Sequence, residues 1–380
     1  MPTNIASRSY SHLIYVLDYA PRLICLAWWY ISYIRNIFQQ YIQCAADTGL
    51  GQGGLSGFGE NPVQTSITST MSLDEVVTRL LQHGCRDVTQ ELELKSCSQY
   101  PFTRGGYGII YQGALSNGMK VALKCIEASP AGLWGEWKPT EKSLKHTASE
   151  LYTWSKCDHP GILKVIGFAR IGGHMLLVSP WMKNGSLMEY ISHRPVIDRL
   201  WLSIELAAAI DYLHVQGIAH GDIKPDNIVV SDDGLVQLTD FGSAIFLHFS
   251  ALCFTQTAHT KSTLRYMAPE LLIGERDHCS TQTDIYALGI TILHIMSGEL
   301  PYADKSDFQV WAEVIVRKSL PTRPNFCKYP GVQSEDAGEK LWSLLVQCWS
   351  HIPDDRPTAA EVKDALMEIR RDSITPGAFR

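Results

Sequence analysis

The chain has 380 residues, a length that allows two or three domains. Hydrophobic residues make up 45% of it and charged residues 19%, which is enough apolar material for a sizeable core and argues against global disorder. The net charge is −6, and no run of lysine and arginine is long enough to indicate a nucleic-acid-binding surface. We therefore expect no nucleic acid among the partners.

The ten cysteines form no CxxC pair and show no spacing typical of a zinc site. Scattered cysteines without a secretory signal indicate a reducing compartment with free thiols, so we expect a cytoplasmic protein. For most of these cysteines, burial as a small apolar side chain is the simpler interpretation.

Residues 1–44 form a hydrophobic N-terminal segment, which is strongly apolar and aromatic over residues 10–44. Its longest charge-free run, from Leu23 to Ile34, has only twelve residues, whereas a bilayer span needs about 20. A Trp-Trp-Tyr run within it suits a membrane interface. Two interpretations remain open. The segment is either a membrane-associated helix, or an accessory packing helix or wrongly assigned start.

Residues 45–72 are rich in glycine, serine and threonine, which predicts a linker with little order. Its GLGQGG run has no strand before it and no helix pattern directly after it, so we do not interpret it as a nucleotide-binding loop. Residues 73–96 follow as a lead-in segment with a short predicted helix. Its apolar residues Leu73, Val76, Val77 and Leu80 have helical spacing, and Gly84 ends the pattern.

From residue 97 the pattern changes again. Short strand-like segments come first, namely IIYQGAL, KVALKCI, LKVIGFA and HMLLVSP. Longer helical patterns dominate afterwards, among them LWLSIELAAAIDYLHVQG and a final helix that begins with the capping box TAAE at Thr358. A β-rich part followed by an α-rich part predicts an α+β fold with two lobes and a ligand-binding cleft between them.

Two motifs in the β-rich part suit a phosphate ligand. Glycines at 105, 106 and 108 in TRGGYG allow the backbone to approach phosphate oxygens, although an ordinary β-hairpin is the better interpretation of this motif taken by itself. Lys124 ends the strand-like VALK run and would need an anionic partner if it is buried. That partner would be a phosphate or a carboxylate, and Glu150 in the following helical stretch is well placed. Each residue could instead lie on a solvated surface.

The segment HGDIKPDN, residues 220–227, carries the strongest signal. Asp222, Lys224 and Asn227 together can orient a hydroxyl, neutralise a transferring phosphate and hold a metal ion. Further along stands the sequence Asp-Phe-Gly, in which Asp240 offers a hard oxygen ligand suited to Mg²⁺. An Ala-Pro-Glu sequence that ends at Glu270 follows.

These five motifs occur in the order and with the gaps of the eukaryotic protein kinase family, which the chain resembles over residues 97–370. The resemblance implies a small β-rich N-terminal lobe, a larger α-helical C-terminal lobe and a short tail, residues 371–380. The sequences NGSL, YMAPE and DIYALG look most like the tyrosine-kinase-like group of serine/threonine kinases. The implied activity is transfer of the γ-phosphoryl group of ATP to protein substrates in signal transduction, with Mg²⁺, or Mn²⁺ in its place.

The resemblance also implies roles for single residues. Lys124 would bind the α- and β-phosphates and pair with Glu150. Asp222 would align or deprotonate the substrate hydroxyl, Lys224 would contact the γ-phosphate, and Asn227 with Asp240 would hold the metal ions. The implied ATP-binding set is Thr103, Gly105, Gly106, Gly108, Ile110, Ala122, Lys124, Ser179, Pro180 and Met182.

Some of these positions have more specific implied roles. Ser179 would be a small gatekeeper residue behind adenine, the Pro180 carbonyl would accept from the adenine amino group, and the Met182 N–H would donate to the ring. Thr263 stands where serine/threonine kinases carry a threonine near the catalytic aspartate, which favours a serine or threonine acceptor. Three further residues match structural positions of the large lobe, namely Glu270, Asp284 and Arg356.

The chain departs from the family pattern at two positions. Thr103 replaces the first glycine of the phosphate loop, which should stiffen the loop modestly. Gly221 replaces the arginine that normally receives an activation-loop phosphate, so we expect activity that does not depend on phosphorylation of that loop. A pseudokinase scaffold and a tyrosine kinase are the alternative interpretations, but the lysine and both aspartates that pseudokinases usually lose are present.

Overall fold

A computed structural model describes residues 65–68, 70–105, 108–126, 140–247, 252–254 and 264–373. The chain divides into two compact units, residues 1–60 and 61–380, and every described residue belongs to the second. The hydrophobic segment 1–44, most of the predicted linker and residues 374–380 lie outside the description. Among the residues it covers, no helix is both long and apolar enough to cross a bilayer.

The N-terminal lobe is built on a five-stranded antiparallel sheet with the order β2-β3-β4-β6-β5. Side chains alternate between its two faces, as expected for strands. In β4, Val121, Leu123 and Cys125 are buried on one face, while Ala122 and Lys124 point to the other. The strands are β2 Thr103–Gly105, β3 Gly108–Ala114, β4 Lys120–Cys125, β5 Gly167–Ile171 and β6 His174–Pro180.

The predicted strand over residues 163–169 begins only at Gly167. Before it, Leu163 donates its N–H to the Leu238 carbonyl at 2.9 Å, and Ile162 forms a β-bridge with the same residue. This stretch therefore hydrogen-bonds to a hairpin of the other lobe before the chain enters the sheet. Local β-propensity predicts an extended backbone but does not identify its hydrogen-bond partner. The hairpin and the sheet both offer such partners to an extended segment.

Helix α3, Glu141–Ser155, packs against this sheet. It begins at Thr140, whose side chain accepts a hydrogen bond from the N–H of Ser143, an ordinary N-cap arrangement. Leu144, Ala148 and Leu151 recur at helical spacing and are buried. The same helix carries Glu150, so its packing decides where that carboxylate lies.

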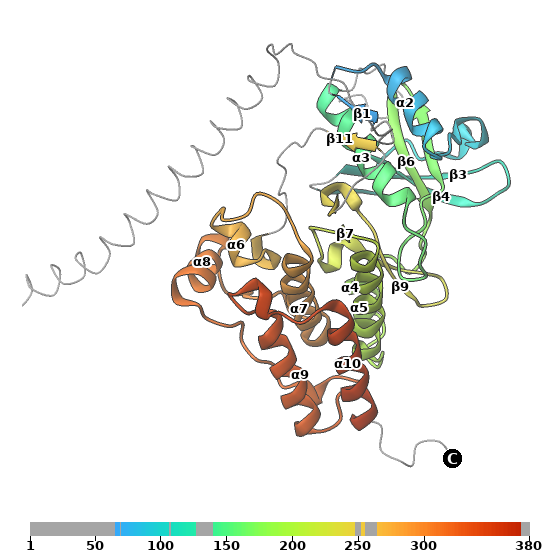
Figure 1. Ribbon diagram of the computed structural model, residues 1–380. Coiled ribbons are helices and arrows are strands. Elements are labelled where there is room, and N and C mark those ends of the chain that lie inside the picture. The colour runs from blue at the N-terminus through green and yellow to red at the C-terminus, as the bar shows by residue number, and fades with distance from the viewer. Residues whose placement is uncertain are drawn as a thin grey trace, which may run out of the picture. The chain divides into compact units, whose positions relative to one another are not determined.

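The C-terminal lobe is helical, as Figure 1 shows. Helix α5, Arg199–Val215, buries a face that includes Leu202, Leu206 and Ile210, and Gly217 follows it with a φ of 69°. The Thr358 capping box at the start of the last helix is also confirmed. The helices are α4 Leu187–Ser192, α5 Arg199–Val215, α6 Pro269–Leu272, α7 Thr281–Ser297, α8 Asp307–Trp311, α9 Glu335–Cys348 and α10 Ala359–Ser373.

Short strand pairs flank the polar segments of this lobe. Strand β8, Ile228–Val230, pairs with β9, Val236–Leu238, and β7, Ile218–Ala219, pairs with β10, Ile245–Phe246. The segments that hold Asp222, Asn227 and Asp240 come directly before or after these strands. The pairing therefore fixes both ends of each of these polar segments.

The lead-in segment packs into the same unit. Helix α2, Leu73–Gln82, begins with a capping box between Ser72 and Glu75 and buries the predicted face that includes Val76, Val77 and Leu80. Within the predicted linker, Thr65–Ile67 forms strand β1, which pairs in parallel with β11, Leu252–Phe254. Glycine and serine content predicted little order here, but the β-branched Thr65 and Ile67 favour an extended backbone once a partner strand is available.

Candidate functional site

Lys124 lies between two carboxylates that come from distant parts of the chain. Its Nζ is 2.6 Å from Oε1 of Glu150 on α3 and 3.0 Å from Oδ1 of Asp240, which precedes β10. The side chains of Lys124 and Asp240 are each 13% exposed, and that of Glu150 is fully buried. The sequence placed a lysine at the end of a strand and a glutamate on a helix, and the structure brings both together with Asp240.

Burial and charge shift the pKa values of these three groups in different directions. Burial disfavours the ammonium of Lys124, but the carboxylates of Asp240 and Glu150 outweigh this effect and raise its pKa. Burial raises the pKa of Glu150 to about 7, against the attraction of Lys124. Burial also opposes ionisation of Asp240, yet the nearby Lys124 ammonium holds its pKa below the usual value. Asp240 is therefore the more firmly ionised of the two carboxylates.

A second polar group is formed by Asp222, Lys224 and Asn227, all at least 96% buried. The Lys224 Nζ is 2.8 Å from Oδ2 of Asp222. The amide nitrogen of Asn227 donates to the same carboxylate oxygen at 2.6 Å and to the Asp222 carbonyl at 2.8 Å. These contacts hold one oxygen of the Asp222 carboxylate in place.

The two groups are joined through the backbone. Thr239, next to Asp240, donates its N–H to the Asn227 carbonyl at 2.9 Å. Asp240 itself has a left-handed backbone with φ 67° and ψ 75°, which is uncommon for a residue other than glycine. The buried Phe241 ring stacks on Trp154 of α3 and meets His220 edge-on, with centroid separations of 5.9 and 5.1 Å. This aromatic packing supports the unusual conformation of Asp240.

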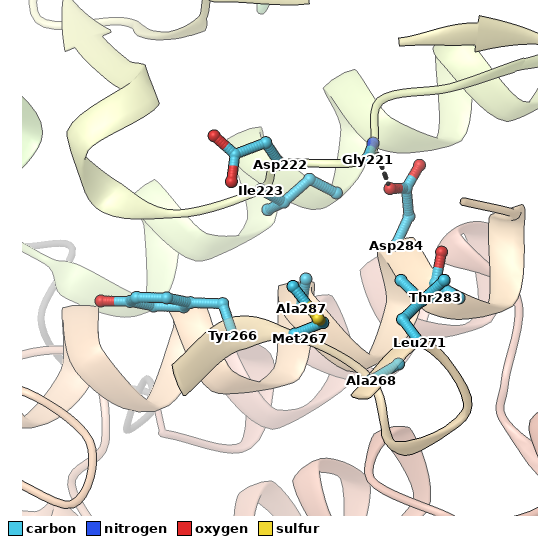
Figure 2. Close-up of a pocket in the computed structure, with 10 residues that line it drawn as sticks. All are labelled: Gly221, Asp222, Ile223, Tyr266, Met267, Ala268, Leu271, Thr283, Asp284 and Ala287. Carbon is cyan, nitrogen blue, oxygen red and sulfur yellow. Dashed lines mark hydrogen bonds between the residues drawn. The ribbon is translucent and has the colours of Figure 1, made fainter. Parts of the chain in front are cut away.

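Asp284, near the start of α7, anchors the segment that carries Asp222. Its carboxylate accepts hydrogen bonds from the N–H of His220 at 2.8 Å and of Gly221 at 2.9 Å. Figure 2 shows this carboxylate reaching from α7 to the Gly221 nitrogen. His214, at the end of α5, places Nε2 3.0 Å from the same carboxylate. The sequence pattern does not reveal the role of His214, because a lone histidine in an apolar helix gives no distinctive signal.

The structure also places the residues that were expected to contact the nucleotide. Residues directly opposite each other in an antiparallel pair share a face. Ile110 lies opposite both Thr103 and Lys124, and Ala122 lies opposite Ser179. One face of the sheet therefore presents Thr103, Ile110, Ala122, Lys124 and Ser179 together.

The glycine turn between β2 and β3 pairs Gly105 with Gly108. Gly108 has a φ of 140°, and a Cβ at this position would lie 2.7 Å from the Cys125 carbonyl oxygen, so a side chain would not fit there. Gly106 lies outside the described residues, as does Thr263.

Pro180 is the last residue of β6, and Met182 lies in the segment that follows it. The Met182 carbonyl accepts from the N–H of Gly185 at 3.3 Å, and Trp181 donates its N–H to the Lys120 carbonyl at 3.0 Å. The ring of Trp181 meets that of Phe102 edge-on with centroids 4.8 Å apart. This contact ties the residues before the glycine turn to the segment after β6. No sequence motif indicates it, because the two aromatic residues are far apart in the chain.

A small pocket lies beside Asp222, between the segment that carries it and the start of α7. Figure 2 shows Tyr266 and Met267 on the side facing Ile223. Its full lining is Gly221, Asp222, Ile223, Tyr266, Met267, Ala268, Leu271, Thr283, Asp284 and Ala287.

Comparisons with known proteins agree with this geometry. The family described as "Protein kinase domain" matches residues 102–366. Receptor-like kinase TMK2 of Arabidopsis thaliana is 29% identical over 304 residues, which cover 75% of this chain and 32% of that protein. Serine/threonine-protein kinase STY46 of the same plant is 27% identical over 272 residues, or 70% of this chain and 43% of that protein.

A third relative comes from a sponge. Tyrosine-protein kinase SRK3 of Spongilla lacustris is 26% identical over 286 residues, which cover 73% of this chain and 77% of that protein. The match thus spans less than half of TMK2 and of STY46, but most of SRK3. The family match covers well over half of the chain and includes every polar residue of the assembled site. The chain therefore belongs to the protein kinase family and has its two-lobed α+β fold.

Proposed function

We propose that the protein transfers the γ-phosphoryl group of ATP to serine or threonine hydroxyls of protein substrates. The observation that carries this proposal is the position of Lys124, 2.6 Å from Glu150 and 3.0 Å from Asp240. A lysine held by a helix carboxylate beside a metal-binding aspartate is the arrangement that phosphoryl transfer in this family requires. Protein kinase domains use ATP and a divalent metal ion in general, and Mg²⁺ is the ion that we propose here.

The donor set fits such an ion. Asp240 supplies a carboxylate whose pKa is held low, and Asn227 supplies an amide oxygen while its nitrogen is bound to Asp222. Hard oxygen donors of this kind suit Mg²⁺. When bound, the ion would neutralise charge on the phosphate oxygens. We propose that Asp240 and Asn227 hold it, and that Lys124 binds the α- and β-phosphates.

We propose that Asp222 aligns the substrate hydroxyl and accepts its proton. Lys224 and Asn227 both hold Oδ2 of Asp222, which orients the carboxylate. We also propose that Lys224 contacts the γ-phosphate as it moves to the acceptor. The protein would act chiefly by positioning its reactants and compensating charge, because the transferred group passes through a loose transition state with little covalent chemistry.

The choice of acceptor rests on resemblance. Names among the relatives include both serine/threonine-protein and tyrosine-protein kinases. Thr263 and its surrounding sequence favour a serine or threonine acceptor, and placement in the tyrosine-kinase-like group stays a prediction. We also propose that the protein is cytoplasmic. Membrane association through residues 10–44 remains an open prediction.

The decisive experiment compares full-length wild type with Asp222→Asn in Mg²⁺-ATP, with autophosphorylation and a generic protein substrate as readouts. Loss of a positioned base should lower turnover by about 10²–10⁴-fold, while nucleotide binding is kept. Phosphoamino-acid analysis of the product should show phosphoserine or phosphothreonine. Phosphotyrosine alone would assign a tyrosine kinase. A wild type that binds nucleotide but transfers no phosphate would indicate a pseudokinase scaffold.

A further inference from the structure

The lead-in segment lies N-terminal to residues 102–366, yet it packs against the parts of the lobe that carry the site. Val76, Val77 and Leu80 of α2 are at most 5% exposed, and Ile67 of β1 is fully buried. All four belong to the same core cluster as Leu151 and Trp154 of α3. A helix that only joined two domains would not need to bury one face in this way.

Specific contacts tie the end of α2 to the C-terminal half of α3. The Lys156 Nζ, just after α3, donates to the His83 carbonyl at 2.9 Å. The ring of His83 meets the Tyr152 ring edge-on at 6.1 Å, and the Cys85 thiol lies 3.6 Å from the Ser155 hydroxyl. These contacts fall within two turns of Glu150, so they bear on the position of that carboxylate.

The segment also holds the edge of the sheet that carries Lys124. Phe168 of β5 exchanges backbone hydrogen bonds with this segment: its N–H donates to the Arg86 carbonyl at 2.9 Å, and its carbonyl accepts from the Val88 N–H at 2.8 Å. Arg170, on the same strand, lies 3.2 Å from Asp87 and 3.6 Å from Asp74. Helix α3 and the sheet are therefore connected through residues 74–88 as well as directly.

Just before the lead-in segment, strand β1 reaches the part of the chain between Asp240 and the Ala-Pro-Glu sequence. Strand β1 pairs with β11 in parallel, with Thr65 opposite Leu252 and Ile67 opposite Phe254. Strand β11 also contacts α3. Residues 65–88, a stretch of about 25 residues, thus contact α3, the edge strand β5 and strand β11. Helix α3 carries Glu150, and the sheet to which β5 belongs carries Lys124 on its central strand β4.

We propose that residues 65–88 act as a positioning element for the Lys124–Glu150 pair, with Leu80 as its central residue. Leu80 has no exposed surface and lies on the face of α2 that enters the core. When this face packs, α3 is held at the distance at which Glu150 reaches Lys124. This inference rests on the proposed function, because the pair matters only if it serves a bound nucleotide.

The test compares Leu80→Ala with Leu81→Ala in the full-length protein. Leu81 is 48% exposed on the same helix, so it is the matched control. We expect Leu80→Ala to weaken Mg²⁺-ATP binding and lower kcat/KM for ATP at least fivefold, at a temperature where circular dichroism shows a folded protein. Leu81→Ala should stay within twofold of wild type, and Leu80→Met, which keeps the volume, should restore most of the loss.

A double variant separates positioning from general destabilisation. If Leu80 acts through Glu150, Leu80→Ala should cause less than a twofold further loss of Mg²⁺-ATP affinity in a Glu150→Gln background. An equal loss in both backgrounds would overturn the proposal, as would a Leu80→Ala variant that binds ATP like the Leu81→Ala control. If Leu80→Ala does not fold, Lys156→Met at the exposed end of α3 replaces it, because this variant removes the contact with His83. Mg²⁺-ATP binding like that of the Leu81→Ala control, or an equal loss of affinity in the wild-type and Glu150→Gln backgrounds, would again overturn the proposal.

The binding readout keeps the two proposals distinct. A wild type that binds Mg²⁺-ATP but transfers no phosphate would refute the proposed function. The dependence of nucleotide affinity on Leu80 would still decide whether residues 65–88 position the pair.

Discussion

At the scale of the single residue, burial and the Lys124 ammonium act on Glu150 in opposite directions. Its Oε1 binds Lys124, while its buried Oε2 has no hydrogen-bond partner among the described residues. An uncompensated buried carboxylate oxygen favours the protonated form, which agrees with a pKa raised to about 7 by burial. The Glu150 carboxyl group of this pair therefore changes its charge close to neutral pH.

This shift predicts a pH dependence of stability. The folded-state pKa of about 7 lies above the ordinary value of 4.5, so between these limits the folded protein holds a proton that the unfolded chain releases. The contribution of Glu150 to the free energy of unfolding should be full below pH 4.5 and should be lost as pH rises through 7. Urea unfolding at pH 5 to 8 measures this in the nucleotide-free protein.

Glu150→Gln is the reference for that experiment, because other groups titrate in the same range. The difference in unfolding free energy, wild type minus variant, should decrease from pH 5 to 7 and level off above. A difference that stays constant or increases with pH would show that Glu150 is ionised throughout.

At the scale of the element, the segment around Asp222 is shaped by Gly221. Its φ is 78°, and a Cβ there would lie 2.8 Å from both the Cys279 thiol and the Ser243 carbonyl oxygen. A left-handed backbone without room for a side chain favours glycine strongly. In this chain, the residues around position 221 leave no space for the arginine that the family usually carries there.

Activity should consequently be independent of phosphorylation between Asp240 and Glu270. No arginine stands at position 221 to form charge-assisted hydrogen bonds with a phosphate. The experiment replaces each candidate acceptor by alanine and measures turnover, with Thr263 set apart because of its expected structural role. The positions, which lie outside the described residues, are Thr255, Thr257, Thr260, Ser262 and Thr263. Complete loss in one variant, restored by a glutamate there, would contradict this prediction.

The start of α6 is joined to the segment before α10 by a buried ion pair. Two nitrogens of Arg356 bind the two oxygens of Glu270, each at 2.7 Å, and Nε donates to the Ser350 carbonyl at 2.9 Å. The Arg356 side chain has no exposed surface, and that of Glu270 is 4% exposed. Arg356→Met would leave a buried carboxylate without its partner.

We expect Arg356→Met to lower the free energy of unfolding by about 3–5 kcal/mol. Lys183→Met is the control, because the Lys183–Asp232 pair is mostly exposed and such pairs contribute little to stability. Chemical denaturation of both variants measures the difference. An equal, small effect would show that the buried pair is dispensable.

At the scale of the whole molecule, membrane association through residues 10–44 is a prediction from the sequence that can be tested directly. Full-length protein should sediment with anionic lipid vesicles if these residues form an interfacial helix, and a variant lacking residues 1–44 should stay in the supernatant with unchanged turnover. Equal partition of both proteins would favour the alternative, an accessory helix or a wrongly assigned start.

Several features of the molecule follow from short stretches of sequence. The alternation in β4, the buried face of α5 and the capping box at Thr358 each depend on residues within a few positions of one another. Steric preferences and local hydrogen bonds act over that range, so pattern is enough to predict them. The order and spacing of the motifs likewise predict Lys124, Asp222 and Asp240 as site residues.

Only the tertiary structure decided how distant segments meet. Lys124 and Asp240 are 116 positions apart, and no local preference brings them to 3.0 Å. The same is true of β1, which pairs with β11 although its surroundings read as a linker. Such contacts form because packing the whole core buries apolar surface on both partners at once, and that gain depends on the complete arrangement rather than on any one segment. The sequence determined which chemical groups the site contains, and long-range packing determined that they share one place.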